Sequence, residues 1–200
     1  MVDTRTSLVI TTAVIIIAVI AILMILVTPH TKRAVVKVGL ITIPADTPRI
    51  LVSSVFKNGS QIPIEYTCDG ADISIPISLS NIPNSTKSIM VVMEDLNAPS
   101  GVFIHWVLYD VPPNITQIPE GLPAVFYIPG IGYQGVNDFS RVGYGGPCPP
   151  PGPSHEYVVV VLALKTVIKP LPNVSDRYLL SLLNESDIVG YGVLIGYYGG

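Results

Sequence analysis

Charged side chains are scarce in this sequence. Asp, Glu, Lys and Arg together make up 12% of the 200 residues, about half of the roughly 25% that is typical of soluble domains. Their balance is acidic in residues 38–200, which hold seven Lys and Arg against thirteen Asp and Glu, so that 7 − 13 = −6. Nucleic-acid binding needs a basic face for the phosphates. The sequence therefore predicts no nucleic-acid partner.

Histidine is also scarce, with three residues in the whole chain. Because His30 lies before residues 38–200, that region holds only His105 and His155. Neither belongs to a His-x-His or His-x-x-x-His pair, the local spacings that would favour a zinc site, and we predict no metal and no cofactor. The sequence also lacks the Gly-x-Ser-x-Gly motif of serine hydrolases. We expect no enzymatic activity.

A long apolar run lies near the N-terminus. Leu8–Val27 contains twenty residues without a charge, which is about the length that a helix needs to cross a bilayer. The apolar region of a signal peptide is shorter, about 7–15 residues, and ends at a small-residue cleavage site. We predict a tail over residues 1–7, a transmembrane anchor or uncleaved signal over 8–27, and a tether over 28–37. The alternative is a cleaved signal and a secreted domain.

Two observations disagree about the side of the membrane on which the domain lies. Lys32, Arg33 and Lys37 follow the run, and basic flanks favour the cytoplasmic side. Five of the eight asparagines in residues 38–200, however, begin an Asn-x-Ser/Thr sequon, which marks surface loops of exported proteins. We give the sequons more weight and predict a single-pass cell-membrane protein with its C-terminal domain outside; a cytoplasmic domain with incidental sequons is the alternative. The candidate glycosylation sites are Asn58, Asn84, Asn114, Asn173 and Asn184.

Residues 38–200 have the pattern of a β-protein. All 19 prolines and 17 glycines lie beyond residue 28 and separate short apolar runs, which favours strands and turns over long helices. Strict alternation would place His105 and Trp106 on opposite faces of one strand, and Ser175 is a suitable N-cap for a helix over 176–184. We predict a mainly β domain, an antiparallel β-sandwich with one or two short helices, preceded by the single N-terminal transmembrane helix.

Five stretches, in the same order along the chain, carry a resemblance to a known family. The sequence resembles the phosphatidylethanolamine-binding protein family, in its prokaryotic Raf-kinase-inhibitor-like branch, over roughly residues 50–198. The resemblance implies a β-sandwich with a small anion pocket for phosphate-bearing head groups, and some members are described as inhibitors of kinases or serine proteases. The stretches are Tyr66–Gly70, Ser88–Pro99, Ile104–Pro112, Gly135–Phe139, and Gly143–Gly152 leading to His155–Tyr157.

The resemblance also implies which residues bind the ligand. The turn that starts at Asp95 departs from the family's usual Asp-Pro-Asp-Ala-Pro, because Leu96 replaces the proline and Asn97 replaces the second acid. The usual His-Arg-Tyr is His-Glu-Tyr here, so that Glu156 reverses a charge. The implied ligand-binding residues are Asp95, Asn97, His105, His155 and Tyr157, together with Gly146 and Pro147 on the loop that closes the rim.

These residue types suit a phosphate site on physical grounds as well. Imidazole N–H groups, the Tyr157 hydroxyl and the backbone N–H groups of a glycine-rich turn are donors for an anion. Asp95 would repel the anion, so we expect it to accept a histidine N–H, which fixes the tautomer and favours the cationic ring. Binding of the anion should then strengthen as the pH falls towards about 6.

The remaining predictions concern the cysteines and the partners. Cys68 and Cys148 are an even pair, and we expect a disulfide that joins the turn at 66–70 to the pocket loop; two free thiols are the alternative. The function that we predict is a membrane-tethered extracellular binding protein for a small phosphorylated or anionic ligand. The alternative is a protein-interaction regulator, above all a serine protease inhibitor whose partner is a protease and whose reactive loop lies within Leu122–Gly135.

Overall fold

The computed structural model describes residues 14–18 and 34–200, and the chain divides into two units, residues 1–33 and 34–200. Residues 14–18 are helical. Among the described residues, none of the helices combines the length and the apolar character that a bilayer crossing requires. Most of the predicted anchor over 8–27, together with the tail over 1–7 and the tether up to residue 33, lies outside the described residues.

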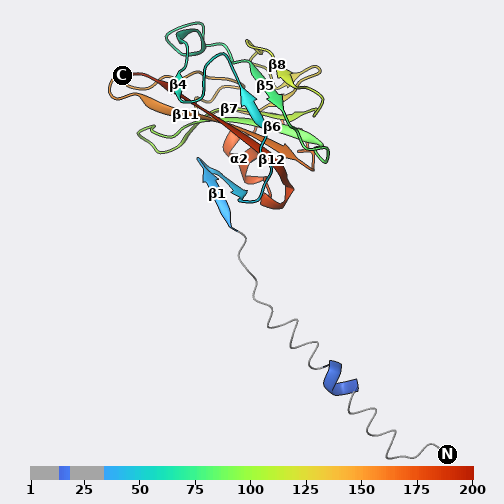
Figure 1. The fold of residues 1–200 in the computed structure, drawn as a ribbon. Helices are drawn as coiled ribbons and strands as arrows, with labels where there is room; N and C mark the ends of the chain where they lie inside the picture. The colour runs from blue at the N-terminus through green and yellow to red at the C-terminus, as the bar shows by residue number, and fades with distance from the viewer. Residues whose placement is uncertain (1–13, 19–33) are drawn as a thin grey trace, which may run out of the picture. The chain divides into compact units, whose positions relative to one another are not determined.

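The second unit is built on a seven-stranded sheet, in which β6 and β11 are central and almost entirely buried (Figure 1). Long apolar runs are typical of strands that are covered on both faces. All neighbouring strands are antiparallel except β12 and β4, which run parallel. In spatial order the strands are β4 (Ser60–Gln61), β12 (Ile188–Tyr198), β11 (His155–Leu164), β6 (Ser88–Asp95), β7 (Phe103–Val111), β10 (Gly132–Gln134) and β9 (Tyr127–Ile128).

A second, three-stranded sheet packs on one face of the central sheet. It consists of β3 (Leu51–Ser53), β5 (Ile77–Ser80) and β8 (Gln117–Ile118), and the short 3-10 helix η1 (Ile64–Tyr66) precedes β5 in the chain. Apolar side chains of β5 and β8 form one core cluster with alternate residues of β6, β7 and β11. The alternation follows from the two-residue period of a strand.

The hairpin of β1 (Val35–Val38) and β2 (Ile41–Pro44) and the helix α2 (Asp176–Ser181) cover the opposite face. Figure 1 shows both below the sheet, with β5 and β8 above it. Ser175 accepts a hydrogen bond from the Tyr178 N–H and caps α2, as predicted. α2 ends at Ser181, earlier than the predicted end at residue 184. Asn184 instead caps the next helix, the 3-10 helix η2 (Glu185–Asp187). β1 makes residues 35–37 part of the folded unit instead of the predicted tether.

The mainly β prediction is confirmed, but two details of it are wrong. The sheets are mixed and number three among the described residues, so they do not form a plain antiparallel sandwich. His105 and Trp106 do not lie on opposite faces, because Met93 pairs with Trp106 while Glu94 pairs with Ile104. His105 is therefore the extra residue of a β-bulge. Both side chains turn to the face of the three-stranded sheet, where Trp106 belongs to the core cluster and the His105 ring contacts another of its members.

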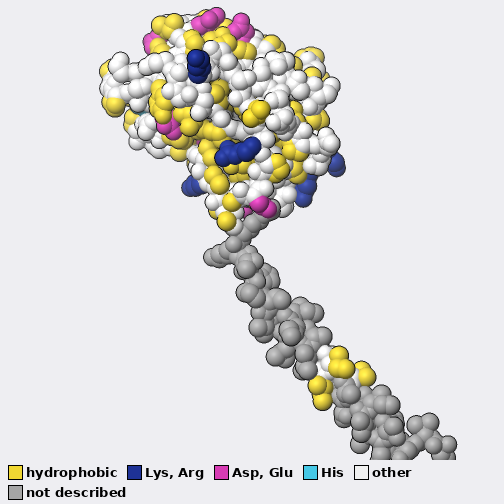
Figure 2. Space-filling model, in the orientation of Figure 1, with side chains coloured by type: hydrophobic (Ala, Val, Ile, Leu, Met, Phe, Trp, Pro, Cys, Tyr) yellow, Lys and Arg dark blue, Asp and Glu magenta, His cyan; other side chains and the backbone are white. Residues whose placement is uncertain are grey.

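The surface of the domain agrees with its low charge. Figure 2 shows isolated basic and acidic side chains among apolar and uncharged ones on the face that it draws, and no continuous basic stripe on that face.

Candidate functional site

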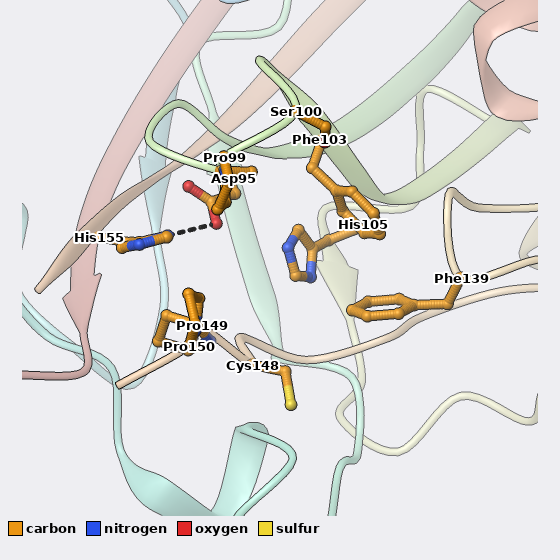
Figure 3. Close-up of a pocket in the computed structure, with 11 residues that line it drawn as sticks. Asp95, Pro99, Ser100, Phe103, His105, Phe139, Cys148, Pro149, Pro150 and His155 are labelled. Carbon is orange, nitrogen blue, oxygen red and sulfur yellow. Dashed lines mark hydrogen bonds and ion pairs between the residues drawn. The ribbon is translucent and has the colours of Figure 1, made fainter. Parts of the chain in front are cut away.

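Three adjacent strands deliver the candidate residues to one end of the central sheet. Asp95 ends β6, His105 forms the bulge of β7, and His155 begins β11. A pocket of about 310 Å³ lies there, and Figure 3 shows these three side chains around it. The other residues that line it are Ala98, Pro99, Ser100, Phe103, Phe139, Cys148, Pro149 and Pro150.

His155 and Asp95 form a buried pair. The Nδ1 atom of His155 donates to Oδ2 of Asp95 at 2.8 Å, and the two residues are only 6% and 3% exposed. The second carboxylate oxygen accepts the Asn97 N–H at 2.8 Å. A carboxylate that accepts the Nδ1 proton fixes the tautomer and the orientation of the ring. The histidine that Asp95 was expected to orient is therefore His155.

His105 bonds to a main-chain carbonyl instead of a carboxylate, and its ring is neutral. Its Nδ1 atom lies 2.7 Å from the carbonyl oxygen of Gly145, and because a carbonyl only accepts, Nδ1 must carry the proton. Burial lowers the pKa of His105, a shift that nearby carbonyls and Asp95 oppose only in part. The ring is therefore neutral and Nε2 has a free lone pair, which Figure 3 shows turned toward the space beside Asp95 and His155.

Tyr157 lies beneath the pocket and does not line it. Its side chain is fully buried, and its ring makes an edge contact with the His105 ring at 5.2 Å between centroids. Burial and the nearby charge of Asp95 raise the pKa of Tyr157 above its ordinary value, so the phenol keeps its proton. Its hydroxyl lies near the Asp95 carboxylate and the Cys148 backbone, which both influence this pKa.

The glycine-rich loop has a role other than the one expected. The Gly146 N–H donates to Oδ1 of Asp72 at 2.6 Å, and the Gly145 N–H donates to the His105 carbonyl at 3.0 Å, so neither amide is free for an anion. Pro147 accepts from the Cys68 N–H at 3.1 Å, and neither Gly146 nor Pro147 lines the pocket. These residues hold the loop in place.

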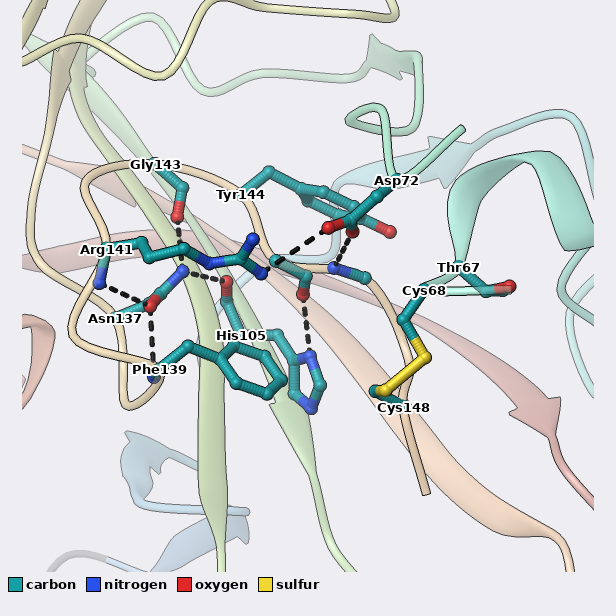
Figure 4. A network of polar contacts seen from close by, with 12 residues as sticks. Thr67, Cys68, Asp72, His105, Asn137, Phe139, Arg141, Gly143, Tyr144 and Cys148 are labelled. Carbon is teal, nitrogen blue, oxygen red and sulfur yellow. Dashed lines mark hydrogen bonds and ion pairs between the residues drawn. A yellow bond between two sulfur atoms is a disulfide. The ribbon is translucent and has the colours of Figure 1, made fainter. Parts of the chain in front are cut away.

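A disulfide ties the same loop to the turn at 66–70. Cys68 and Cys148 are joined with their Cα atoms 5.3 Å apart, which is the pairing that the sequence analysis expects (Figure 4). Asn97 is exposed and its side-chain oxygen accepts the Glu156 N–H at 2.8 Å. Asn97 thus links the turn after β6 to β11, and it is not among the residues that line the pocket.

The sequence did not reveal the aromatic walls of the pocket or the buried asparagine that holds the surrounding backbone. The rings of Phe103 and Phe139 pack edge-on against His105 at 5.1 and 5.2 Å between centroids. The buried Asn137 amide donates to the carbonyls of Gly143 at 2.9 Å and His105 at 3.3 Å (Figure 4). Phe103 could have been found, because it precedes His105 by two residues in one strand.

Few formal charges surround the pocket. No Lys or Arg belongs to the residues that line the pocket, and Arg141 of the pocket loop is paired with Asp72 at 3.4 Å. The described residues contain no group of three or more His, Cys, Asp or Glu that could hold a metal. The pocket therefore offers two imidazoles and one carboxylate within apolar walls.

Comparisons with known proteins agree with this geometry. A family model described as phosphatidylethanolamine-binding protein matches residues 52–199. UPF0098 proteins of Aquifex aeolicus and Pyrococcus horikoshii are 45% and 41% identical over 144 and 150 residues, which cover 72% and 74% of this chain and 84% and 75% of theirs. A crystal structure of a phosphatidylethanolamine-binding protein homologue from Chlamydia trachomatis has a TM-score of 0.68 at 31% identity and covers 77% of this chain and 99% of its own. Escherichia coli YbcL gives 0.68 at 29%, covering 76% and 99%. The chain belongs to the phosphatidylethanolamine-binding protein family.

Proposed function

We propose that residues 34–200 form a binding domain for small phosphate-bearing or related anionic ligands. The observation that carries this proposal is the convergence of the buried His155–Asp95 pair and His105 on one small pocket with apolar walls. When His155 gains a second proton, both ring nitrogens become donors and the ring carries a positive charge that Asp95 balances.

The test is calorimetric titration of the protein with phosphoethanolamine between pH 5.5 and 7.5. We expect affinity to rise as the pH falls towards about 6, because a positively charged imidazole attracts the anion. Burial disfavours the charged form of His105, whereas the Asp95 carboxylate lies 2.8 Å from Nδ1 of His155 and can balance a positive charge there. His155→Gln should flatten the profile while its amide still donates to Asp95. His30→Gln is the matched control, because His30 is the one histidine that precedes residues 34–200. A flat wild-type profile would remove the proposed mechanism.

We further propose that the domain is tethered to the outer face of a cell membrane. The support is the uncharged run over residues 8–27 and the exposure of all five sequon asparagines. A disulfide also suits an oxidising compartment. Expression in a host that adds N-glycans should give a product that stays with membranes after alkaline carbonate and loses mass with a glycosidase. A product that is soluble and unglycosylated would contradict the proposal.

Protease inhibition is the second candidate, and one feature favours it. The segment around Pro123–Val125 is exposed, yet the Gln134 amide holds it by donating to the carbonyls of Pro123 and Val125 at 2.8 and 2.9 Å. A protease inhibitor must present a rigid, exposed segment to the protease that it binds. The absence of inhibition of representative serine proteases at micromolar protein would remove this candidate.

A further inference from the structure

A second groove lies on the face of the central sheet that the β1–β2 hairpin covers. Its volume is about 480 Å³, and it shares no lining residue with the pocket beside His155. β11 and β12 form its floor and β1 forms one wall. Figure 2 shows apolar side chains around a basic one on the face where Figure 1 places β12. Exposed apolar surface of this kind is typical of an interaction site. The aliphatic lining residues are Val36, Val38, Leu96, Val158, Val193 and Ile195, and all except Val158 are partly exposed.

The wall formed by β1 is an unpaired strand edge. Among the described residues, β1 pairs only with β2. The Ala45 N–H donates to the Ala34 carbonyl at 2.8 Å. Because bonded and non-bonded positions alternate along an antiparallel pair, the main-chain N–H and C=O groups of Lys37 point away from β2, and Lys37 lines the groove. The groove therefore offers a main-chain donor and acceptor beside its apolar floor, and such an edge is a template for an added strand.

Two basic side chains at the rim of the groove have no acidic partner. Lys37 and Arg49 line it, and neither belongs to an ion pair within the part of the chain that the structure describes. The Arg49 guanidinium lies over the Tyr191 ring, with Cζ 4.1 Å from the centroid, and a stacked guanidinium keeps its N–H groups for acceptors. Glu156, the one acid in the lining, already accepts from the Tyr197 hydroxyl at 2.9 Å. Although residues 38–200 are acidic overall, this rim is positive and complements an acidic partner.

We propose that this groove binds an extended peptide segment of a partner protein, which adds to β1 as a third strand, lays aliphatic side chains on the floor and offers a carboxylate to Lys37 and Arg49. Strand addition draws affinity from main-chain hydrogen bonds and specificity from alternate side chains, and the free edge and the apolar floor match these two needs. A second copy of this chain fits less well, because pairing of two β1 edges would bring two positive rims together. A single-chain fatty acid would use the floor and the basic groups but not the strand edge.

The test uses the full chain in lipid nanodiscs, because detergent monomers would compete for an apolar groove. The probe is the capped hexapeptide acetyl-Asp-Val-Thr-Ile-Thr-Val-amide, in which apolar residues alternate and aspartate is the only charge. Calorimetry should detect binding below about 1 mM, and hydrogen exchange over residues 34–39 should slow, because the Lys37 N–H becomes bonded. An analogue that is N-methylated at its three central residues keeps every side chain but loses those main-chain donors. It should bind at least about tenfold more weakly.

A charge reversal tests the contribution of the rim. Lys37→Glu should weaken binding of the aspartate peptide by about two- to fivefold in low salt, and it should favour an analogue with lysine in place of the aspartate. Lys87→Glu is the matched control, because Lys87 is also exposed but does not line the groove, and it should leave the affinities for both peptides unchanged.

Three results would overturn the proposal. The first is no binding of the aspartate peptide at millimolar concentration. The second is equal binding of the N-methylated analogue, which would show that the groove takes apolar chains without strand addition. The third is self-association of the wild type that slows exchange over residues 34–39 without any peptide, since a second copy would then fill the groove.

Discussion

Glu94 gives the clearest link between the structure and a measurable stability. It is fully buried, and its carboxylate accepts the Leu40 N–H of the β1–β2 turn, with both oxygens at 3.2 Å. Burial raises the pKa of Glu94 from 4.5 to about 7, although the Leu40 bond and the charge of Arg177 act in the other direction. The folded state therefore holds this proton more tightly than the unfolded state does.

The size and the sign of the effect follow from that shift. Between pH 4.5 and 7 the folded form keeps a proton that the unfolded chain has lost, so the free energy of unfolding falls by about 1.4 kcal/mol per pH unit. Over this interval the loss amounts to about 3 kcal/mol, and above pH 7 it stays constant. Glu94→Gln removes the titration but keeps a side-chain oxygen for the Leu40 N–H. We expect the variant to be more stable than the wild type by about 1–3 kcal/mol at pH 8, the lower value allowing for an unpaired amide N–H.

The assay is urea unfolding at pH 4.5, 6 and 8, followed by the fluorescence of the single tryptophan, Trp106, which is fully buried. The difference between Glu94→Gln and wild type should be small at pH 4.5 and should grow through pH 6 to its full value at pH 8. Glu185→Gln is the control, because that carboxylate is exposed. Parallel stability profiles for wild type and Glu94→Gln, or a variant that is less stable at pH 8, would refute the reasoning.

Three further predictions concern the site. Replacing Cys68 and Cys148 by serine should lower the free energy of unfolding by about 2–4 kcal/mol and weaken ligand binding, since Cys148 lines the pocket; unfolding with and without reductant measures the first effect and calorimetry the second. Asp95→Asn should leave His155 without the carboxylate that orients its ring, so that anion binding weakens, which calorimetric titration at pH 6 and 7.5 checks. Asn137→Ala should cost about 2 kcal/mol by leaving the Gly143 carbonyl and the Phe139 and Arg141 N–H groups without the side chain that they bond, measured by urea unfolding.

Local patterns predicted the regular parts of the fold. The short apolar runs between prolines and glycines form strands such as β6 and β11, and α2 begins after the Ser175 cap. These features depend on neighbours within a few positions, which the sequence displays directly. Hydrogen bonds between residues that are far apart in the sequence could not be predicted from such local patterns. The Gly146 N–H is bonded to Asp72, 74 positions earlier in the chain, so a free amide donor was the natural but wrong expectation.

Buried acids were equally hard to foresee. Glu94 and Asp176 are both fully buried, although charged residues are usually exposed. Both carboxylate oxygens of Asp176 lack a partner among the described residues, and burial raises the pKa of Asp176 well above its ordinary value. From composition alone, both acids would be expected at the surface. They are buried because the β1–β2 hairpin and α2 pack against the sheet.

The bulge in β7 connects the irregular part of the fold with the chemistry of the pocket. Because the extra residue turns His105 and Trp106 to one face, both hold elements that border the site: His105 bonds to Gly145, and Trp106 donates to the Gln134 side chain at 2.8 Å. A regular strand would have sent one of the two rings to the opposite core. The bulge therefore brings the His105 ring against a main-chain carbonyl, that carbonyl fixes which ring nitrogen carries the proton, and the other ring nitrogen faces the pocket. The tautomer of His105 thus follows from a single inserted residue in β7.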